Sequence, residues 1–243
     1  AWILISVFIA VWLVITVYPF IFMVLNSFKG QFEILANGVF SIPESFNLEN
    51  YKEVFSNGIV RYFLNSIFVC AVSLVIALFI SSLAAYPIAR MRSKVGKWFL
   101  LLVLACALIG PDIAFALPIS VFILSGFMED LPKELEEAGQ IDGCGRVKAF
   151  FHIVLPLTRP GMATLAIYNG VAFWNEFIFS YTLTQSRENR TLPLATWDFQ
   201  GAYSMNAPMI MAVLTITMIP MLILFAVFQE KLMNSMTIGA IKG

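Results

Sequence analysis

Charged residues are scarce in this chain of 243 residues. Only 12% of them are Asp, Glu, Lys or Arg, whereas 60% are hydrophobic. Soluble domains carry about 25% charged residues, so this composition excludes an ordinary soluble domain. Several apolar stretches approach or exceed the roughly 20 residues that a helix needs to cross a bilayer, which predicts an integral membrane protein. The formal net charge of zero indicates no partner, because the placement of charges matters more than their sum in membrane proteins.

Residue types that support catalysis and metal binding are also scarce. The single histidine is His152, and the three cysteines, Cys70, Cys106 and Cys144, show no CxxC pairing. A hydrolase needs a nucleophile with a base, or metal ligands, so an intramembrane enzyme has little support and no metal site is expected. The phosphate-binding pattern G-x-x-x-x-G-K-[ST] is absent, which argues against ATP hydrolysis by this chain. A secondary transporter would usually show internal repeats and intramembrane ion ligands, and neither is found.

Apolar segments suited to membrane helices occupy most of the chain. Prolines lie near the ends of the first two, and Gly110-Pro111-Asp112 interrupts the third. Such residues are tolerated in membrane helices where neighbouring helices or cavities satisfy the freed backbone groups. The first segment lacks the small-residue cleavage pattern of a signal peptide. The segments are approximately 1–25, 63–89, 98–127, 162–183 and 209–228.

The distribution of Lys and Arg between the apolar segments predicts their orientation. Residues 90–97 and 129–159 are rich in basic side chains and are expected in the cytoplasm, as are both termini. Residues 28–62 and 184–208 are expected outside, because the basic side chains there are few or are offset by acids. The chain between the two cytoplasmic loops must then cross the membrane an even number of times. Residues 98–127 suffice for only one crossing of a hydrocarbon core about 30 Å thick.

Two explanations of this conflict are open. Either Gly110-Pro111 is the tip of a re-entrant hairpin, or a segment is absent from the chain near residues 110–112. The second explanation is favoured, and it requires that a fuller sequence contain additional apolar residues near Pro111.

One densely polar stretch, Glu136–Leu157, interrupts the apolar sequence. Residues 133–140 are good helix formers, and Gly143 with Gly145 would end that helix. Beyond them, apolar residues recur at helical spacing up to Pro156. The pattern predicts a helix, a tight turn and a second helix at the cytoplasmic membrane surface. Composition alone leaves a plain solvated loop as the alternative.

The order of residues in this stretch resembles the Glu-Ala-Ala loop of ABC importer permeases. Glu137-Ala138-Gly139 is followed after three residues by Gly143, and after nine more by Ile153-x-Leu155-Pro156. Every spacing of the family pattern matches, and one residue departs from it, since Gly139 stands where the family usually has alanine. The resemblance implies that this loop couples the chain to an ATPase through Glu137, Ala138, Gly139, Asp142, Gly143, Arg146, Ile153, Leu155 and Pro156.

Other stretches resemble the carbohydrate branch of this family, in particular its maltose-type second permease subunit. They are NSIFVCAVSLVIALFISSLAAYPIAR, ELEEAGQIDG, FFHIVLPLTRPGMAT, AFWNEF and TIGAIKG, and the likeness covers nearly the whole chain. The resemblance implies an all-α, polytopic membrane protein whose residues 1–243 form a single permease domain, with about six helices of about 20 residues in the full chain. The third apolar segment would then be two spans, 98–109 and 113–127, and residues 129–160 would hold a cytoplasmic coupling helix.

The resemblance implies a transport subunit of a bacterial inner or plasma membrane and not an enzyme. Its expected partners are a second permease subunit, two ATPase subunits, an extracellular or periplasmic solute-binding protein, a carbohydrate (in particular an oligosaccharide) and the lipid bilayer. No nucleic acid and no cofactor are expected on this chain, since ATP and Mg would bind to the partner ATPase. Rigid coupling helices would transmit closure of the ATPase dimer, so that the membrane helices alternate between inward-open and outward-open states. A permease for a non-sugar solute stays open as an alternative, because the loop motif is shared.

Polar and aromatic residues near the end of segment 162–183 are candidates for the substrate path. They are Trp174, Asn175, Glu176 and Tyr181. A buried acid costs about 2–3 kcal/mol at the bilayer centre, and a structural polar pair is an equally open role for the amide and the carboxylate. The external loop Thr196–Pro208 lies where the family reaches into the binding protein, although without the resemblance it would be interpreted as a plain connector. Its candidate contacts are Gln200, Gly201, Ala202, Tyr203, Ser204, Met205 and Asn206.

Overall fold

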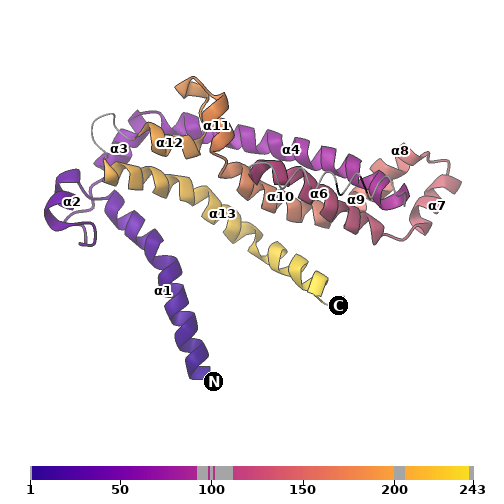
Figure 1. The fold of residues 1–243 in the computed structure, drawn as a ribbon, viewed down its shortest axis with the longest axis horizontal. Helices are drawn as coiled ribbons and strands as arrows, with labels where there is room; N and C mark the ends of the chain where they lie inside the picture. The colour runs from indigo at the N-terminus through magenta and orange to yellow at the C-terminus, as the bar shows by residue number, and fades with distance from the viewer. Residues whose placement is uncertain (1, 92–97, 99–100, 102–111, 200–205, 241–243) are drawn as a thin grey trace. The chain divides into compact units, whose positions relative to one another are not determined.

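The computed structural model of this protein describes residues 2–91, 98, 101, 112–199 and 206–240. The regular elements in this part of the chain are all helical (Figure 1), as the sequence predicts. They fall into two compact units. The first unit contains α1 (Trp2–Ser27), α2 (Gln31–Asn37), α3 (Glu49–Ser56), the start of α4 (Ile59–Met91), α11 (Ile178–Leu183), the 3-10 helix η2 (Arg187–Asn189), α12 (Leu192–Asp198) and the first part of α13 (Ala207–Ala240). The second unit contains the rest of α4, α6 (Asp112–Glu129), α7 (Glu134–Ile141), α8 (Arg146–Ala149), the π-helix η1 (Phe150–Val154), α9 (Leu155–Leu157), α10 (Arg159–Trp174) and the end of α13.

Three helices of the described part are long and apolar enough to cross a membrane, namely Trp2–Ser27, Ile59–Arg90 and Ala207–Val227. A fourth candidate arises if Arg146–Leu157 and Arg159–Trp174, which are bent by 69° at their break, count as one span. These helices agree with the predicted all-α, polytopic class. The total of about six spans stays a prediction, because most of the predicted span 98–109 and the join near residues 110–112 lie outside the described residues.

The fifth apolar segment differs from the continuous helix expected over residues 162–183. Helix α10 ends at Trp174 and α11 begins at Ile178. Asn175 explains the end of α10, because its side-chain Nδ2 donates to the carbonyl oxygen of Val171 at 2.9 Å, the carbonyl that its own backbone N–H also approaches at 3.2 Å. Asparagine side chains that bond to nearby backbone groups compete with continuation of a helix. The same break separates the two compact units along the chain.

The core of the second unit lies where α4, α6 and α10 run side by side (Figure 1). Ala85 and Ala89 of α4 pack against Leu124 of α6 and Leu165 of α10, and all four are buried. Small residues permit close approach of helices, which drives helix association in membranes. Helices α6 and α10 approach closely at Gly161, where a Cβ atom would lie only 2.8 Å from the Cδ2 atom of the Phe127 ring.

A buried polar contact joins the same helices. Asn169 Nδ2 of α10 donates to Ser120 Oγ of α6 at 2.8 Å, and both residues are fully buried. Interhelical hydrogen bonds of this kind contribute about 0.6–2 kcal/mol in membrane proteins. The contact therefore fixes the register of α6 against α10. Helix α6 precedes the polar stretch described below, and α10 follows it.

In the first unit, the segment after α1 folds around the buried side chain of Lys29. Its Nζ atom donates to the carbonyl oxygens of Gly38 and Val39, each at 3.3 Å, and to Ser41 Oγ at 3.0 Å. Asn50 Nδ2 donates to the carbonyl oxygen of Lys29 at 2.8 Å. A buried ammonium group needs such partners, because an unpaired one is costly. These bonds hold the predicted external segment between α1 and α4 in a compact form.

Candidate functional site

Helix α7 ends at a glycine in the left-handed conformation. Gly143 has φ of +82°, a left-handed conformation that glycine adopts at little cost. The Gly143 N–H donates to the carbonyl oxygen of Gln140 at 3.0 Å, and the Cys144 N–H donates to that of Gly139 at 2.8 Å. These two bonds form a Schellman cap, which satisfies carbonyl groups at the end of a helix. The predicted stop at Gly143 is confirmed.

A second helical arm follows the turn and runs from Arg146 to Leu157. It contains the π-helical stretch Phe150–Val154, and it continues through Pro156 before it bends by 69° into α10. π-Helical turns occur often at functional sites. The prediction of helix, turn and helix is therefore confirmed, and the sharp bend fixes the direction in which the second arm joins the apolar helix α10.

The two arms touch at the position where the sequence departs from the family pattern. A Cβ atom on Gly139 would lie 2.5 Å from Cδ1 of Ile153, whereas the next nearest atom, Cys144 Cβ, would be 3.9 Å away. Glycine thus allows the isoleucine side chain of the second arm to pack directly on the backbone of α7. This contact gives the departure from alanine a physical reason.

The predicted coupling residues divide into an exposed group and an inner group. Gly139 is buried, and Ile153, Leu155 and Pro156 are half-buried, so these residues hold the two arms together. The exposed group, which is free to contact a partner, consists of Glu137, Ala138, Asp142, Gly143 and Arg146.

Two apolar side chains accompany the exposed group, and the sequence reasoning missed both. Ile141 is 87% exposed and Val147 is 71% exposed, on either side of the glycine turn. A cavity of about 430 Å³ opens between α7 and the end of α4, and Glu137 and Arg146 are among its lining residues. Exposed apolar side chains beside charged ones are typical of surfaces that bind another protein. The signal was available, since an isoleucine and a valine in a polar loop are otherwise unexplained.

A buried polar network joins α7 to the end of α4, and the sequence reasoning missed this too. The guanidinium of Arg90 forms an ion pair with Glu136, with 2.5 Å between Nε and Oε1. The hydroxyl of Tyr86 donates to the other carboxylate oxygen of Glu136 at 2.8 Å. Arg90 Nη1 also donates to the carbonyl oxygen of Leu131 at 3.2 Å. The only hint in the sequence was that Glu136 lies one helical turn before Gly139 and so shares its inward face.

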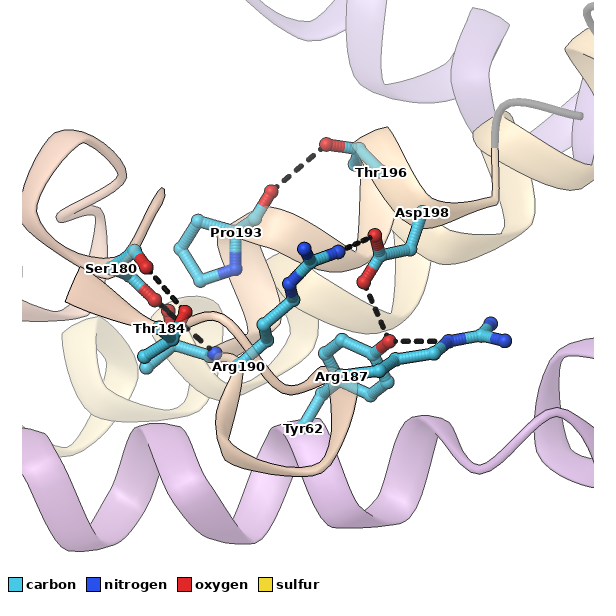
Figure 2. Close-up of polar contacts among 9 residues, drawn as sticks. Tyr62, Ser180, Thr184, Arg187, Arg190, Pro193, Thr196 and Asp198 are labelled. Atoms are coloured by element: carbon cyan, nitrogen blue, oxygen red, sulfur yellow. Dashed lines mark hydrogen bonds and ion pairs between the residues drawn. The ribbon is translucent and has the colours of Figure 1, made fainter. Parts of the chain in front are cut away.

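The base of the loop before α13 is held by a second network, within the first unit (Figure 2). The hydroxyl of Tyr62 donates to Asp198 Oδ2 at 2.6 Å and accepts from Arg187 Nε at 2.8 Å. Arg190 forms an ion pair with the same aspartate. Tyr62 is only 3% exposed, so these bonds are sheltered and fix α12 against the start of α4.

The predicted binding-protein contacts follow Asp198 in the sequence. Residues 200–205 lie outside the described residues. Asn206 is described, and its Oδ1 atom accepts from the backbone N–H of Met209 at 3.2 Å, which caps α13. Asn206 therefore has a structural role, and the contact role of the loop stays a prediction.

The predicted substrate-path residues are divided between the two units. Trp174, Asn175 and Glu176 lie at the end of α10 in the second unit, where the tryptophan is buried and the asparagine is exposed. Tyr181 lies on α11 in the first unit, stacked on Phe177 with 5.7 Å between ring centroids, and its side chain is half exposed. A role for these residues in a solute passage stays a prediction.

Metal chemistry finds no support in the described part of the chain. Among those residues there is no group of three or more His, Cys, Asp or Glu side chains that could hold a metal ion. The ring of His152 is exposed, and its Nδ1 atom lies 3.0 Å from the carbonyl oxygen of Lys148, one turn earlier in the same arm. This contact is that of an ordinary helix residue.

Comparison with known proteins gives matches over nearly the whole chain. The profile of the family described as "Binding-protein-dependent transport system inner membrane component" matches residues 1–237. A protein of Caldicellulosiruptor sp. (strain Rt8B.4), named as an ABC transporter permease, is 39% identical over 263 residues, which cover 98% of this chain and 96% of the relative. That alignment is longer than this chain of 243 residues, so the relative carries residues without a counterpart here.

Two other relatives have names that state a solute. The sulfoquinovosyl glycerol transport system permease protein SmoH of Agrobacterium fabrum is 32% identical and covers 93% of this chain and 89% of its own length. The arabinooligosaccharides transport system permease protein AraQ of Halalkalibacterium halodurans is 31% identical, with coverages of 94% and 92%. A solved bacterial ABC transporter involved in import of the acidic polysaccharide alginate matches with a TM-score of 0.77 at 18% identity, over 94% of this chain and 95% of that chain. This last likeness concerns the fold alone.

Proposed function

Since the chain belongs to the family of binding-protein-dependent transport system inner membrane components, we propose that its solute is a carbohydrate, in particular an oligosaccharide. The chain is a multi-pass permease subunit of an ABC importer in the inner membrane, and it is not an enzyme. In the proposed mechanism, a partner ATPase hydrolyses ATP, and the permease alternates between inward-open and outward-open states.

The observation that carries the mechanism is the shape of the polar loop. Helix α7 ends in a Schellman cap at Gly143, and the second arm returns and bends into the apolar helix α10. A compact unit of this kind moves as one body, so a force applied to its exposed residues reaches the membrane helices without being absorbed by a flexible loop. The exposed Glu137, Asp142 and Arg146 would meet the ATPase, while Ile141 and Val147 would add apolar contact.

The choice of a carbohydrate is supported by the relatives that have named solutes. SmoH and AraQ are named for a sulfoquinovosyl glycerol and for arabinooligosaccharides, respectively. Further relatives at about 30% identity are named for uptake of diacetylchitobiose and of melibiose, raffinose and stachyose. A permease for a non-sugar solute remains the alternative.

The proposed assembly contains a second permease subunit, two ATPase subunits that bind ATP and Mg, and a solute-binding protein. The family description names a binding protein, and the ABC transporters among the similar proteins imply an ATPase partner. Two groups of residues on this chain would take part in solute delivery and passage. The external loop of residues 200–206 would contact the binding protein, and Trp174, Asn175, Glu176 and Tyr181 would line part of the passage. The rigid base that Tyr62 and Asp198 provide supports the first of these roles.

The carbohydrate is tested with the purified complex in lipid vesicles. A panel of mono- and oligosaccharides is offered with the cognate binding protein, and ATP hydrolysis and solute uptake are measured together. We expect stimulation by at least one oligosaccharide. Stimulation by amino acids or phosphonates, with no response to any sugar, would favour the alternative solute class.

The mechanism is tested at Gly143 with a matched pair of variants. Valine at a left-handed position costs about 1–2 kcal/mol, whereas asparagine tolerates that conformation and serves as the control. We expect Gly143→Val to assemble but to hydrolyse ATP without solute uptake, and Gly143→Asn to retain most uptake per ATP. Normal uptake by a correctly assembled Gly143→Val complex would contradict coupling through this loop.

A further inference from the structure

The network of Tyr86, Arg90 and Glu136, in which Glu136 is buried and the other two residues are half-buried, lies outside the coupling motif, yet it contacts the motif helix directly. We propose that this network is a positioning device that locks α7 to the end of α4, so that movement of the coupling loop is transmitted to α4 as well as to α10. The inference rests on the proposed function, because it concerns how the same loop transmits force. In this proposal, the three side chains act by positioning α7 and do not themselves bind solute or nucleotide.

Two neighbouring acids on α7 differ in exposure. Glu137, the first residue of the motif, is exposed, whereas Glu136 is 9% exposed. A helix turns by about 100° per residue, so adjacent side chains point in different directions. The exposed carboxylate is available to a partner, while the buried one is committed to Arg90 and Tyr86 within the same unit. Glu137 can therefore contact a partner, while Glu136 attaches α7 to α4.

Tyr86 contacts both arms of the helix–turn–helix at once. Its hydroxyl bonds to Glu136 on α7, and its ring packs against Phe150 of the second arm, with 5.0 Å between ring centroids. Phe150 is the first residue of the π-helical stretch and is 3% exposed. A single side chain of α4 therefore holds the relative position of α7 and the second arm.

Arg90 completes the lock in the last turn of α4. Its side chain is 11% exposed, and that of Glu136 is 12% exposed. The same guanidinium bonds to the carbonyl oxygen of Leu131, in the connection between α6 and α7. Removing one partner of a buried ion pair leaves an uncompensated charge, and such pairs are costly to break singly. The contact is therefore stiff, which a mechanical link requires.

The network adds a route that the covalent chain does not provide. Along the chain, the coupling loop connects only to α6 before it and to α10 after it, and the connection to α10 includes the 69° bend. Helix α4 ends many residues earlier, at Met91. The three side chains join its end to α7 directly, so the bend need not carry all of the force.

The test uses the complete complex in lipid vesicles and measures the ratio of solute imported to ATP hydrolysed. Glu136→Gln and Arg90→Gln should each lower this ratio at least about fivefold, the lower end of typical couplings between sites. The double variant removes both charges and should do no more harm than either single change. The exposed Glu134→Gln on the same helix is the control, and its ratio should stay unchanged.

A purely structural role makes a different prediction. It would reduce the amount of assembled complex and leave the ratio of import to hydrolysis unchanged, and that result would overturn the proposal. Additive effects of the two single changes would overturn it as well. If the charge variants do not assemble, Tyr86→Phe keeps the ion pair, and loss of one hydrogen bond should lower the ratio at least about twofold. An unchanged ratio in Tyr86→Phe would then decide against the lock.

Gly143→Val distinguishes failure of this inference from failure of the proposed function. If Gly143→Val abolishes coupled import while Glu136→Gln leaves the ratio unchanged, the loop couples and only the lock is wrong. If neither variant alters the ratio, coupling through this loop is itself wrong.

Discussion

The contact between Gly139 and Ile153 gives a quantitative prediction about how the two arms pack. Alanine at position 139 would place a Cβ atom 2.5 Å from Ile153 Cδ1, a distance that forces the isoleucine to move. Overpacking of this kind costs about 1–3 kcal/mol. Alanine in place of glycine in a helix gains about 1 kcal/mol. The single change Gly139→Ala is therefore expected to be neutral or destabilising by up to about 2 kcal/mol.

The second variant removes the atom that causes the clash. Ile153→Val deletes Cδ1, and by itself it costs about 0.5–1.5 kcal/mol because it leaves a gap. In the double variant, the new methyl group at position 139 occupies part of that gap, and the nearest remaining atoms lie 3.9 Å or more from it. The helix gain is then obtained without strain. The double variant should be more stable than Ile153→Val alone, with a favourable coupling energy of about 1–3 kcal/mol.

The assay is thermal unfolding of the purified complex in one detergent, with the four proteins compared under identical conditions. A difference of 1 kcal/mol shifts the midpoint by about 2–4 °C for a chain of this size. Gly126→Ala in α6 is the matched control, since its Cβ would meet no atom within 4 Å. Additive midpoint shifts for the two changes would refute the reasoning, because they would mean that positions 139 and 153 do not touch.

Two further predictions concern the helix packing and the external loop. Gly161→Ala should lower the unfolding midpoint of the complex, because its Cβ would lie 2.8–3.1 Å from the rigid Phe127 ring and overpacking costs about 1–3 kcal/mol; a midpoint as high as that of Gly126→Ala would contradict this contact. Tyr62→Phe should speed proteolytic cleavage of residues 184–207 in the complex, since it removes the hydrogen bond to Asp198, worth about 0.5–1.5 kcal/mol or more to a charged group; cleavage at the wild-type rate would mean that this bond does not hold the loop.

The sequence predicted the polar loop well because its signals are local. Glycine is the usual residue at the left-handed position of a Schellman cap, which Gly143 occupies. The two helices on either side of it are predicted from residues that are neighbours along the chain. The exposed and inner groups within the motif were not separated in advance. Their separation depends on which face of α7 meets the second arm, and the contact between Gly139 and Ile153 decides that face.

The break between α10 and α11 shows a different kind of miss. Hydrophobicity over residues 162–183 is high enough for one span, and averaging over such a window hides the effect of Asn175. Its side chain bonds to the carbonyl oxygen of Val171, one turn back, at the end of α10. A hydropathy average contains no term for that bond.

Composition and spacing alone determined that this chain belongs in a membrane and that it carries a helix–turn–helix between its apolar helices, because apolar content and short-range periodicity are properties of contiguous residues. Only the tertiary structure decided that Glu136 meets Arg90 and Tyr86, and that Asp198 meets Tyr62. These partners are separated by tens of residues or more along the chain. Their pairing depends on how whole helices pack against one another, which no local pattern of residues records.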